Sequence, residues 1–224
     1  MKFRNECKHY VTEFDIIGLR ERLRVVAKRD KNANRDGYYQ IKSLYFDNCY
    51  DKALNEKLMG LEKREKFRIR YYNNNLDFIR LEKKSKINGL CLKQSAVIEK
   101  GQVERILDGD ISWMKYSDKE LVCELWAKMQ YQLLRPKNIV VYDREAYVYA
   151  PGNVRVTIDS NIRGSDNVIN FLRDDGVELH LFGMNILEVK WDEYLPQIIR
   201  DAVQLDGIKT RSFSKYAATR FSAF

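Results

Sequence analysis

The chain has 224 residues, a formal net charge of +8 and a hydrophobic fraction of 45%, which is enough for a substantial core. Only 3 prolines and 11 glycines argue against disordered linkers, so we expect one domain over residues 1–224. The positive charge favours anionic partners such as phosphates, nucleic acid or acidic lipid, and the 14 tyrosines favour a strand-rich fold.

The cysteine pattern argues against a zinc site, because no CxxC occurs and the chain has only 2 histidines. Scattered reduced thiols are typical of a cytoplasmic protein. The N-terminal MKFRNECKHY lacks the apolar centre of a signal peptide, and no stretch reaches the length of a membrane span. We therefore expect a cytoplasmic protein with no membrane span in this chain.

The first elements expected are a strand over Phe3–Tyr10 and an amphipathic helix over Val11–Lys28. Thr12 is a candidate N-cap for that helix. Its apolar stripe is predicted to contain Phe14, Ile17 and Leu23. A strand over Tyr38–Phe46 follows.

Asp47 is a candidate cap for a helix over Cys49–Met59, and we expect Asp47 and Tyr45 to support the fold. The next stretch, Arg64–Lys86, reads as two strands joined by an Asn-rich turn at Asn73–Asn75. Side chains alternate between the two faces of a strand. One face of this hairpin is therefore apolar, with Phe67, Ile69, Tyr71 and Leu81, and the other is charged, with Lys66, Arg68, Arg70, Arg80, Glu82, Lys84 and Lys86.

The second half of the chain predicts further strands separated by helices. The expected strands are Leu90–Ile98, Asn138–Tyr149, Val154–Asp159, Val177–Phe182 and Asn185–Trp191. The expected helices are Gly101–Leu107, Ser117–Leu134 with Ser117 as its cap, and Gln197–Leu205. Turns are expected at Ile87–Gly89 and Pro151–Asn153, an irregular loop at Asn161–Gly176, and a polar block at Lys209–Tyr216.

About eight strands with charges on one face of most predict an α+β fold: a closed antiparallel β-barrel with helices packed outside. The charged faces would line the inside of the barrel. Burying so many cations costs several kcal/mol each unless they are paired or meet an anionic ligand. The pattern therefore favours a polyanion as partner.

Several short motifs carry a family resemblance over nearly the whole chain. In chain order they are RNECK, SLYFD, KFRIRYY, LEKKSK, the strand around Lys93, YDR, VRVTID, ILEVK and SFSKY. In this order the chain resembles the catalytic domain of the vacuolar transporter chaperone (VTC) polyphosphate polymerases, within the triphosphate tunnel metalloenzyme superfamily. The family fold is an antiparallel barrel whose bore binds a triphosphate and a growing polyphosphate chain.

The resemblance implies a set of site residues. The tunnel cations that touch phosphate would be Lys8, Arg68, Arg70, Lys84, Lys93, Arg144 and Arg155. Tyr142 would lie beside them, Ser214 and Lys215 would bind phosphate near one mouth, and Glu188 would hold a divalent metal, Mn²⁺ or Mg²⁺. Whether Lys83 or Lys84 enters the tunnel depends on register, and parity with Glu82 and Lys86 favours Lys84.

Two positions depart from the patterns of related enzymes. Other tunnel enzymes open with Glu-x-Glu-x-Lys, whereas Arg4 stands first here. That change favours the polymerase branch over relatives resembling thiamine triphosphatase or class IV adenylate cyclase. Ser212 stands where the polymerases have a lysine, so one cation is missing unless Arg211 replaces it.

The resemblance implies a metal-dependent enzyme that transfers the γ-phosphate of ATP to inorganic polyphosphate. A triphosphate or polyphosphate hydrolase is an alternative, because Glu6 or Glu82, expected near the substrate, could accept a proton from water. A non-catalytic polyanion binder is another. We do not expect nucleic acid as the partner, because the hairpin aromatics alternate away from the cations and would not offer bases a stacking surface.

Overall fold

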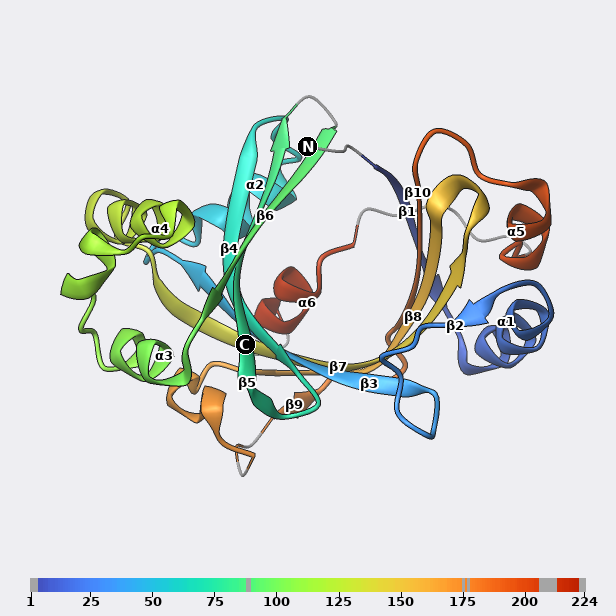
Figure 1. Ribbon diagram of the computed structural model, residues 1–224, viewed down its shortest axis with the longest axis horizontal. Helices are drawn as coiled ribbons and strands as arrows, with labels where there is room; N and C mark the ends of the chain where they lie inside the picture. The colour runs from blue at the N-terminus through green and yellow to red at the C-terminus, as the bar shows by residue number, and fades with distance from the viewer. Residues whose placement is uncertain (1–3, 88–89, 175, 177, 206–212, 222–224) are drawn as a thin grey trace.

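The computed structural model describes residues 4–87, 90–174, 176, 178–205 and 213–221. One strongly curved antiparallel sheet dominates the fold (Figure 1). Its main path runs β1-β10-β8-β7-β3-β4-β5-β6, while the short strands β2 and β9 pair with β7 and β8. The strands are β1 (Asn5–Val11), β2 (Lys28–Arg29), β3 (Tyr38–Asp47), β4 (Arg64–Tyr72), β5 (Asn75–Ile87), β6 (Leu90–Ile98), β7 (Arg135–Tyr149), β8 (Val154–Ser165), β9 (Leu179–His180) and β10 (Asn185–Trp191).

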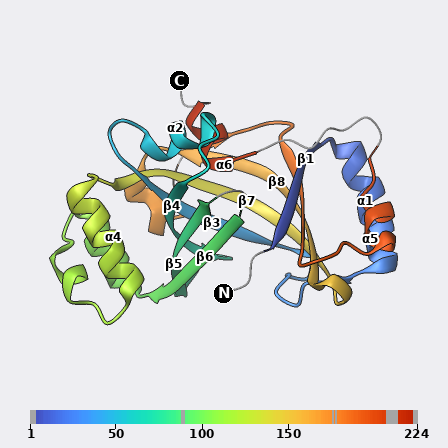
Figure 2. The same ribbon diagram turned by 90° about the horizontal axis from the view of Figure 1, so that it is seen from above.

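Helices cover the convex side of the sheet on two flanks. Figures 1 and 2 show α4 on one flank, and α1 with α5 on the opposite one. The α-helices are α1 (Glu13–Val26), α2 (Lys52–Leu58), α3 (Lys100–Leu107), α4 (Glu120–Tyr131), α5 (Gln197–Ala202) and α6 (Lys215–Phe221). The 3₁₀ helices are η1 (Ser112–Tyr116), η2 (Pro151–Asn153) and η3 (Val168–Leu172).

The central hairpin forms as the sequence predicts. Asn73 and Asn74, between β4 and β5, have φ angles of 50° and 54°, a left-handed conformation that Asn tolerates better than most residues. The apolar side chains Phe67, Ile69 and Tyr71 are buried in a core that α3 and α4 cover. The charged residues of the hairpin therefore face the concave side of the sheet.

The last helix, α6, lies inside the curve of the sheet (Figure 1). Tyr216 stacks on Tyr45 with ring centroids 5.1 Å apart, and its hydroxyl donates to Asp47 Oδ2 over 2.7 Å. The sequence predicts only a polar block here, and residues 209–212 of that block lie outside the described part of the chain. A helix of seven residues, KYAATRF, is too short for periodicity to reveal.

The predicted closed barrel is not confirmed, because the sheet is an open half-barrel. β1 and β6 end the main path, and no pairing joins them within the described residues. A side-chain contact bridges the opening in the described part of the chain: Lys84 Nζ on β5 lies 2.9 Å from Glu6 Oε1 on β1.

The cap of α1 agrees with the sequence: Thr12 Oγ1 accepts from the amide of Asp15 over 3.2 Å. The N-cap position of α2 is Asp51 and not Asp47, but Asp47 accepts from the amides of Ala53 and Leu54 in the first turn. In the apolar stripe predicted for α1, however, Phe14 is 86% exposed and Ile17 57% exposed. The predicted stripe is wrong for Phe14 and Ile17 and right for Leu23, because the buried face of α1 consists of Ile16, Leu19 and Leu23.

Other predictions fail at element boundaries. Ser117 does not cap α4, which begins at Glu120 after Lys119 as N-cap. The predicted loop over Asn161–Gly176 instead begins with the end of β8 and contains η3, and the strand over Val177–Phe182 shortens to β9. Two residues of the turn at Ile87–Gly89 lie outside the described residues. In the described part of the chain, no helix is both long and apolar enough to cross a membrane.

Candidate functional site

A cavity of about 460 Å³ opens on the concave side of the sheet, between β1 and the strands β4, β5 and β6. Cationic side chains dominate its charged lining: Arg4, Lys8, Lys57, Arg64, Lys66, Lys84 and Lys86, against Glu6 and Glu65. Ser214, just before α6, also lines this cavity, and its Oγ accepts from the amide of Ala217 over 3.4 Å.

Glu82 is the carboxylate at the centre of the cations on β4, β5 and β6. Arg68 Nη2 lies 2.6 Å from Glu82 Oε2, Lys93 Nζ 2.5 Å from Oε1, and Arg70 Nη1 3.9 Å from Oε2. Burial alone raises the pKa of Glu82, but the charges of Arg68, Arg70 and Lys93 outweigh it and hold that pKa far below its usual value. The carboxylate is therefore ionised.

Polar side chains from β3 and β7 orient the two arginines. Arg70 Nε donates to Ser43 Oγ over 2.9 Å, and its Nη2 donates to Tyr142 OH over 3.0 Å. Arg68 Nη1 donates to Tyr45 OH over 3.1 Å. Burial raises the pKa of Tyr45, but the neighbouring positive charges, Arg68 first, outweigh it and lower that pKa to about 7.

Glu188, on β10, is the corresponding carboxylate on the other side of the concave face. Its oxygens lie 3.1 Å from Lys8 Nζ, 2.8 Å from Lys190 Nζ and 3.7 Å from Arg144 Nη2. Burial raises the pKa of Glu188, yet these cations hold it well below the usual value. Burial likewise lowers the pKa of Lys190 to about 8, despite the favourable charge of Glu188.

Asp159, on β8, is fully buried beside the same group. Arg144 holds it with two hydrogen bonds of 2.5 and 2.7 Å, and Lys215 from α6 also contacts it. Burial raises the pKa of Asp159, but Arg144 and Lys215 lower it to about 2. The Lys215 ammonium also lies 4.6 Å from the ring centre of Tyr142, which therefore sits among the cations.

Glu6 connects the two sides of the cavity. Lys84 Nζ lies 2.9 and 3.1 Å from its two oxygens, while Lys8 Nζ lies 3.8 Å away. The register question between Lys83 and Lys84 has a structural answer. Lys83 pairs with Glu65 and with Glu124 of α4, whereas Lys84 pairs with Glu6 and lines the cavity, so Lys84 is the lysine on the concave side, as parity indicates.

Arg155 alone among the predicted cations lies apart from these carboxylates. Its strand register places it opposite Lys190, but its guanidinium contacts Asp30 Oδ2 at 2.5 Å and Tyr39 OH at 2.8 Å. The other predicted cations contact Glu6, Glu82, Glu188 or Asp159. The structure thus brings most of the predicted set together; their roles in binding and catalysis stay predictions.

Sequence reasoning missed four residues of this site. They are Tyr45, Lys66, Asp159 and Lys190. Strand alternation could have found Lys66 and Lys190, because each stands two positions from a predicted site residue and therefore shares its face of the strand. Tyr45 had no signal of its own, since an aromatic residue in an apolar strand is more often part of a core.

A divalent metal fits this site only if a ligand supplies part of its coordination. No group of three or more His, Cys, Asp or Glu side chains in the described residues could hold a metal ion. Glu188 and Glu6 nevertheless converge on a single cation, Lys8 Nζ, at 3.1 and 3.8 Å. Mg²⁺ is commonly held by one or two carboxylates together with substrate phosphates, and these two carboxylates match that donor set.

A curved antiparallel sheet with a cationic concave face is the arrangement expected of a protein that binds polyanions. The family model for the VTC domain matches residues 3–224, so the chain belongs to the VTC domain family, which has the triphosphate tunnel metalloenzyme fold. The resemblance carried by the sequence motifs is therefore confirmed, and the family supports a triphosphate-binding tunnel protein.

One solved structure supports the fold. A putative adenylate cyclase from Bacillus halodurans is similar with a TM-score of 0.51 and 12% identity, covering 99% of this chain and 87% of that one. Proteins from Pyrococcus horikoshii OT3 (TM-score 0.44, 15% identity, 89% and 85% coverage) and Pyrococcus furiosus (0.46, 10%, 94% and 97%) are less similar. No curated protein sequence matches the chain.

Proposed function

We propose that this protein is a metal-dependent polyphosphate polymerase that transfers the γ-phosphate of ATP to a growing inorganic polyphosphate chain. The observation that carries the proposal is the convergence of cations from both sides of one concave face around the ionised carboxylates Glu82 and Glu188. A cytoplasmic location and a barrel that closes β1 against β6 around the bound chain are parts of this proposal.

Phosphoryl transfer depends mainly on positioning and on neutralising charge, and the site offers both. A triphosphate carries about four negative charges near neutral pH. Arg68 and Arg70 present guanidinium groups that match pairs of phosphate oxygens, while Lys84 and Lys93 add point charges. The carboxylates that pair with these cations would give way to phosphate oxygens when substrate binds.

A bound Mn²⁺ or Mg²⁺ would neutralise charge on the phosphate oxygens. Glu188 is the residue proposed to hold it, with Glu6 as the second carboxylate, because both face the Lys8 ammonium. Lys8 itself would then be free to contact phosphate.

Transfer to polyphosphate needs no general base, because the terminal phosphate of the chain is already ionised at neutral pH. Hydrolysis would need a group that accepts a proton from water. Burial raises the pKa of Glu6 and of Glu82, but in each the neighbouring cations outweigh it, so both pKa values lie below normal. Carboxylates held in this way are weak proton acceptors, which favours transfer over hydrolysis.

The binder alternative has less support from the hairpin. A nucleic-acid groove would need exposed aromatic rings beside the cations. Phe67 and Tyr71 are instead 1% exposed, on the opposite face of β4 from Arg68 and Arg70.

The test is incubation with ATP and Mn²⁺ followed by gel staining for polyphosphate and assay of free phosphate. Long stained chains would support the polymerase. Free phosphate without chains would support the hydrolase, and neither product would support a binder. Lys100→Gln is a suitable control, because Lys100 starts α3 on the outside of the sheet and is exposed.

A further inference from the structure

Three lysines form a row across neighbouring strands of the concave face. Lys66 on β4 is the register partner of Lys84 on β5, and Lys84 is in turn the partner of Lys93 on β6. Adjacent strands lie about 4.8 Å apart, so the row is a close series of like charges. Like charges directly opposite each other destabilise a sheet. A bound anion would offset the repulsion between these lysines.

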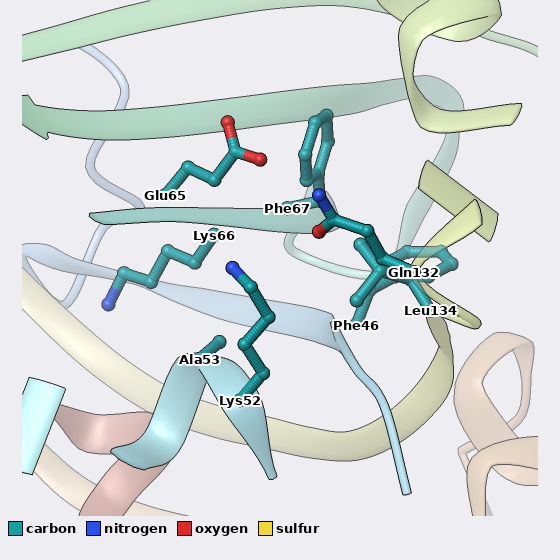
Figure 3. A pocket seen from close by; sticks show the side chains of 8 residues that line it. All are labelled: Phe46, Lys52, Ala53, Glu65, Lys66, Phe67, Gln132 and Leu134. Carbon is teal, nitrogen blue, oxygen red and sulfur yellow. The ribbon is translucent and has the colours of Figure 1, made fainter. Parts of the chain in front are cut away.

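Lys66 differs from its two neighbours in having no carboxylate partner. Lys84 pairs with Glu6, and Lys93 with Glu82. No carboxylate of the described residues lies within ion-pair distance of Lys66. Its ammonium lies 5.6 Å from the centre of the Tyr45 ring. Figure 3 shows that the Lys66 side chain leaves β4 in a different direction from Phe67 and points away from the nearby Glu65 carboxylate.

The groups that face Lys66 are mostly positive. They are Tyr45 from β3, Arg68 from β4, Lys84 from β5 and Lys8 from β1, while α2 contributes Lys57 to the same cavity lining. Burial first, and then the charges of Lys84, Arg68 and Lys8, lower the pKa of Lys66 to about 7, although Tyr45 acts in the opposite direction. Without an added anion this lysine is therefore only partly charged near neutral pH.

We propose that Lys66 binds a phosphate group of an inorganic condensed phosphate, in a subsite that it shares with Lys84 on the wall of the 460 Å³ cavity and that Lys93 extends along the row. This subsite rests on the proposed function and deepens it, because it assigns a place to a phosphate beyond those that Arg68 and Arg70 hold. Binding supplies the anion that Lys66 lacks, so Lys66 takes up a proton as the phosphate arrives.

The experiment is isothermal titration of the full chain with sodium tripolyphosphate, without metal, at pH 8 in two buffers of different ionisation enthalpy. Comparing the buffers gives the number of protons taken up. We expect wild type to take up close to one more proton than Lys66→Arg, because arginine is charged before binding. We expect Lys66→Gln to bind at least about 10-fold more weakly, Lys66→Arg to stay within about 3-fold, and Lys100→Gln to match wild type.

The outcomes separate this proposal from the proposed function. Equal affinity and proton uptake in wild type and Lys66→Arg, with normal affinity in Lys66→Gln, would overturn the subsite while leaving the polymerase proposal intact. A wild type that binds no tripolyphosphate would overturn both. Thermal melting checks that each variant folds, and should Lys66→Gln fail to fold, the proton uptake of Lys66→Arg decides the question.

Discussion

The two sides of the concave face differ in how their charges are balanced. The cation-rich side, on β4, β5 and β6, holds Lys66, Arg68, Arg70, Lys84 and Lys93; Glu82 contacts Arg68, Arg70 and Lys93, while Lys84 pairs with Glu6 on β1. The balanced side, on β1, β7, β8 and β10, matches Lys8, Arg144 and Lys190 with Glu6, Asp159 and Glu188. The excess of positive charge that a polyanion would meet therefore lies on the first side.

This difference predicts different consequences of substitution. A buried ion pair that loses one partner leaves an uncompensated charge in the protein. On the balanced side, substitutions should therefore lower the free energy of unfolding. On the cation-rich side, removing a cation relieves repulsion, so substitutions there should mainly weaken substrate binding and turnover.

The largest effect is expected for Asp159→Asn. It leaves the guanidinium of Arg144 and the ammonium of Lys215 without their shared carboxylate, which is 0% exposed. We expect the free energy of unfolding to fall by about 3–5 kcal/mol, measured by urea denaturation. Lys100→Gln is the control and should change it by less than about 0.5 kcal/mol. A stable Asp159→Asn variant would contradict the distinction between the two sides.

Arg70→Ala should have the largest effect on activity. Arg70 is 4% exposed and is held by Ser43 and Tyr142, so its guanidinium is fixed for phosphate. We expect ATP turnover to fall by about 100-fold or more, because one preorganised charge is lost. Glu82 keeps Arg68 and Lys93, so the melting temperature should change little. Unchanged turnover would count against a role in the bore.

Much of this arrangement could be predicted from the sequence because strand parity is strict. Two arginines separated by one residue in an apolar strand must share a face, which placed Arg68 and Arg70 together. The same rule chose Lys84 over Lys83. Local signals also sufficed for the Asn-rich turn and for Thr12 as a cap.

The rest depends on contacts that sequence patterns do not carry. The helix α6 is short and enters the concave side from a distant part of the chain, so Tyr216 and its partner Asp47 are 169 positions apart. Closure of the barrel depends on whether β1 and β6 meet, and neither strand encodes its partner. Which cation lacks a carboxylate, as Lys66 does, depends on side chains from four separate strands.

The balanced side should also give the protein a stability change in acid. Asp159 has its pKa lowered from 3.8 to about 2, so its contribution is complete above pH 3.8 and disappears as the pH falls through 2. We expect this group to contribute about 2 kcal/mol to the loss of stability over that range. Urea denaturation at several pH values measures it. Asp159→Asn should lack this component, and an unchanged pH profile in the variant would be the contrary result.

Glu188→Gln tests the metal proposal and should have a smaller effect. The amide keeps the size of the side chain but removes the charge that faces Lys8, Lys190 and Arg144. We expect the Mn²⁺ concentration for half-maximal activity to rise by about 10-fold, which is typical when a metal site is weakened. A Mn²⁺ titration of ATP turnover measures this. An unchanged Mn²⁺ requirement would remove Glu188 from the metal site.

The smallest effect is expected for Lys93→Gln, although Lys93 contacts the same carboxylate as Arg68. Its side chain is 51% exposed, so water screens its charge, and an exposed ion pair contributes at most about 1 kcal/mol. Arg68 still neutralises Glu82 in the variant. We expect the KM for ATP to rise by less than about 5-fold with kcat unchanged. Steady-state kinetics of both variants, Lys93→Gln and Arg70→Ala, test this. A loss of kcat as large as that of Arg70→Ala would show that the burial of a cation on this side does not determine its contribution to turnover.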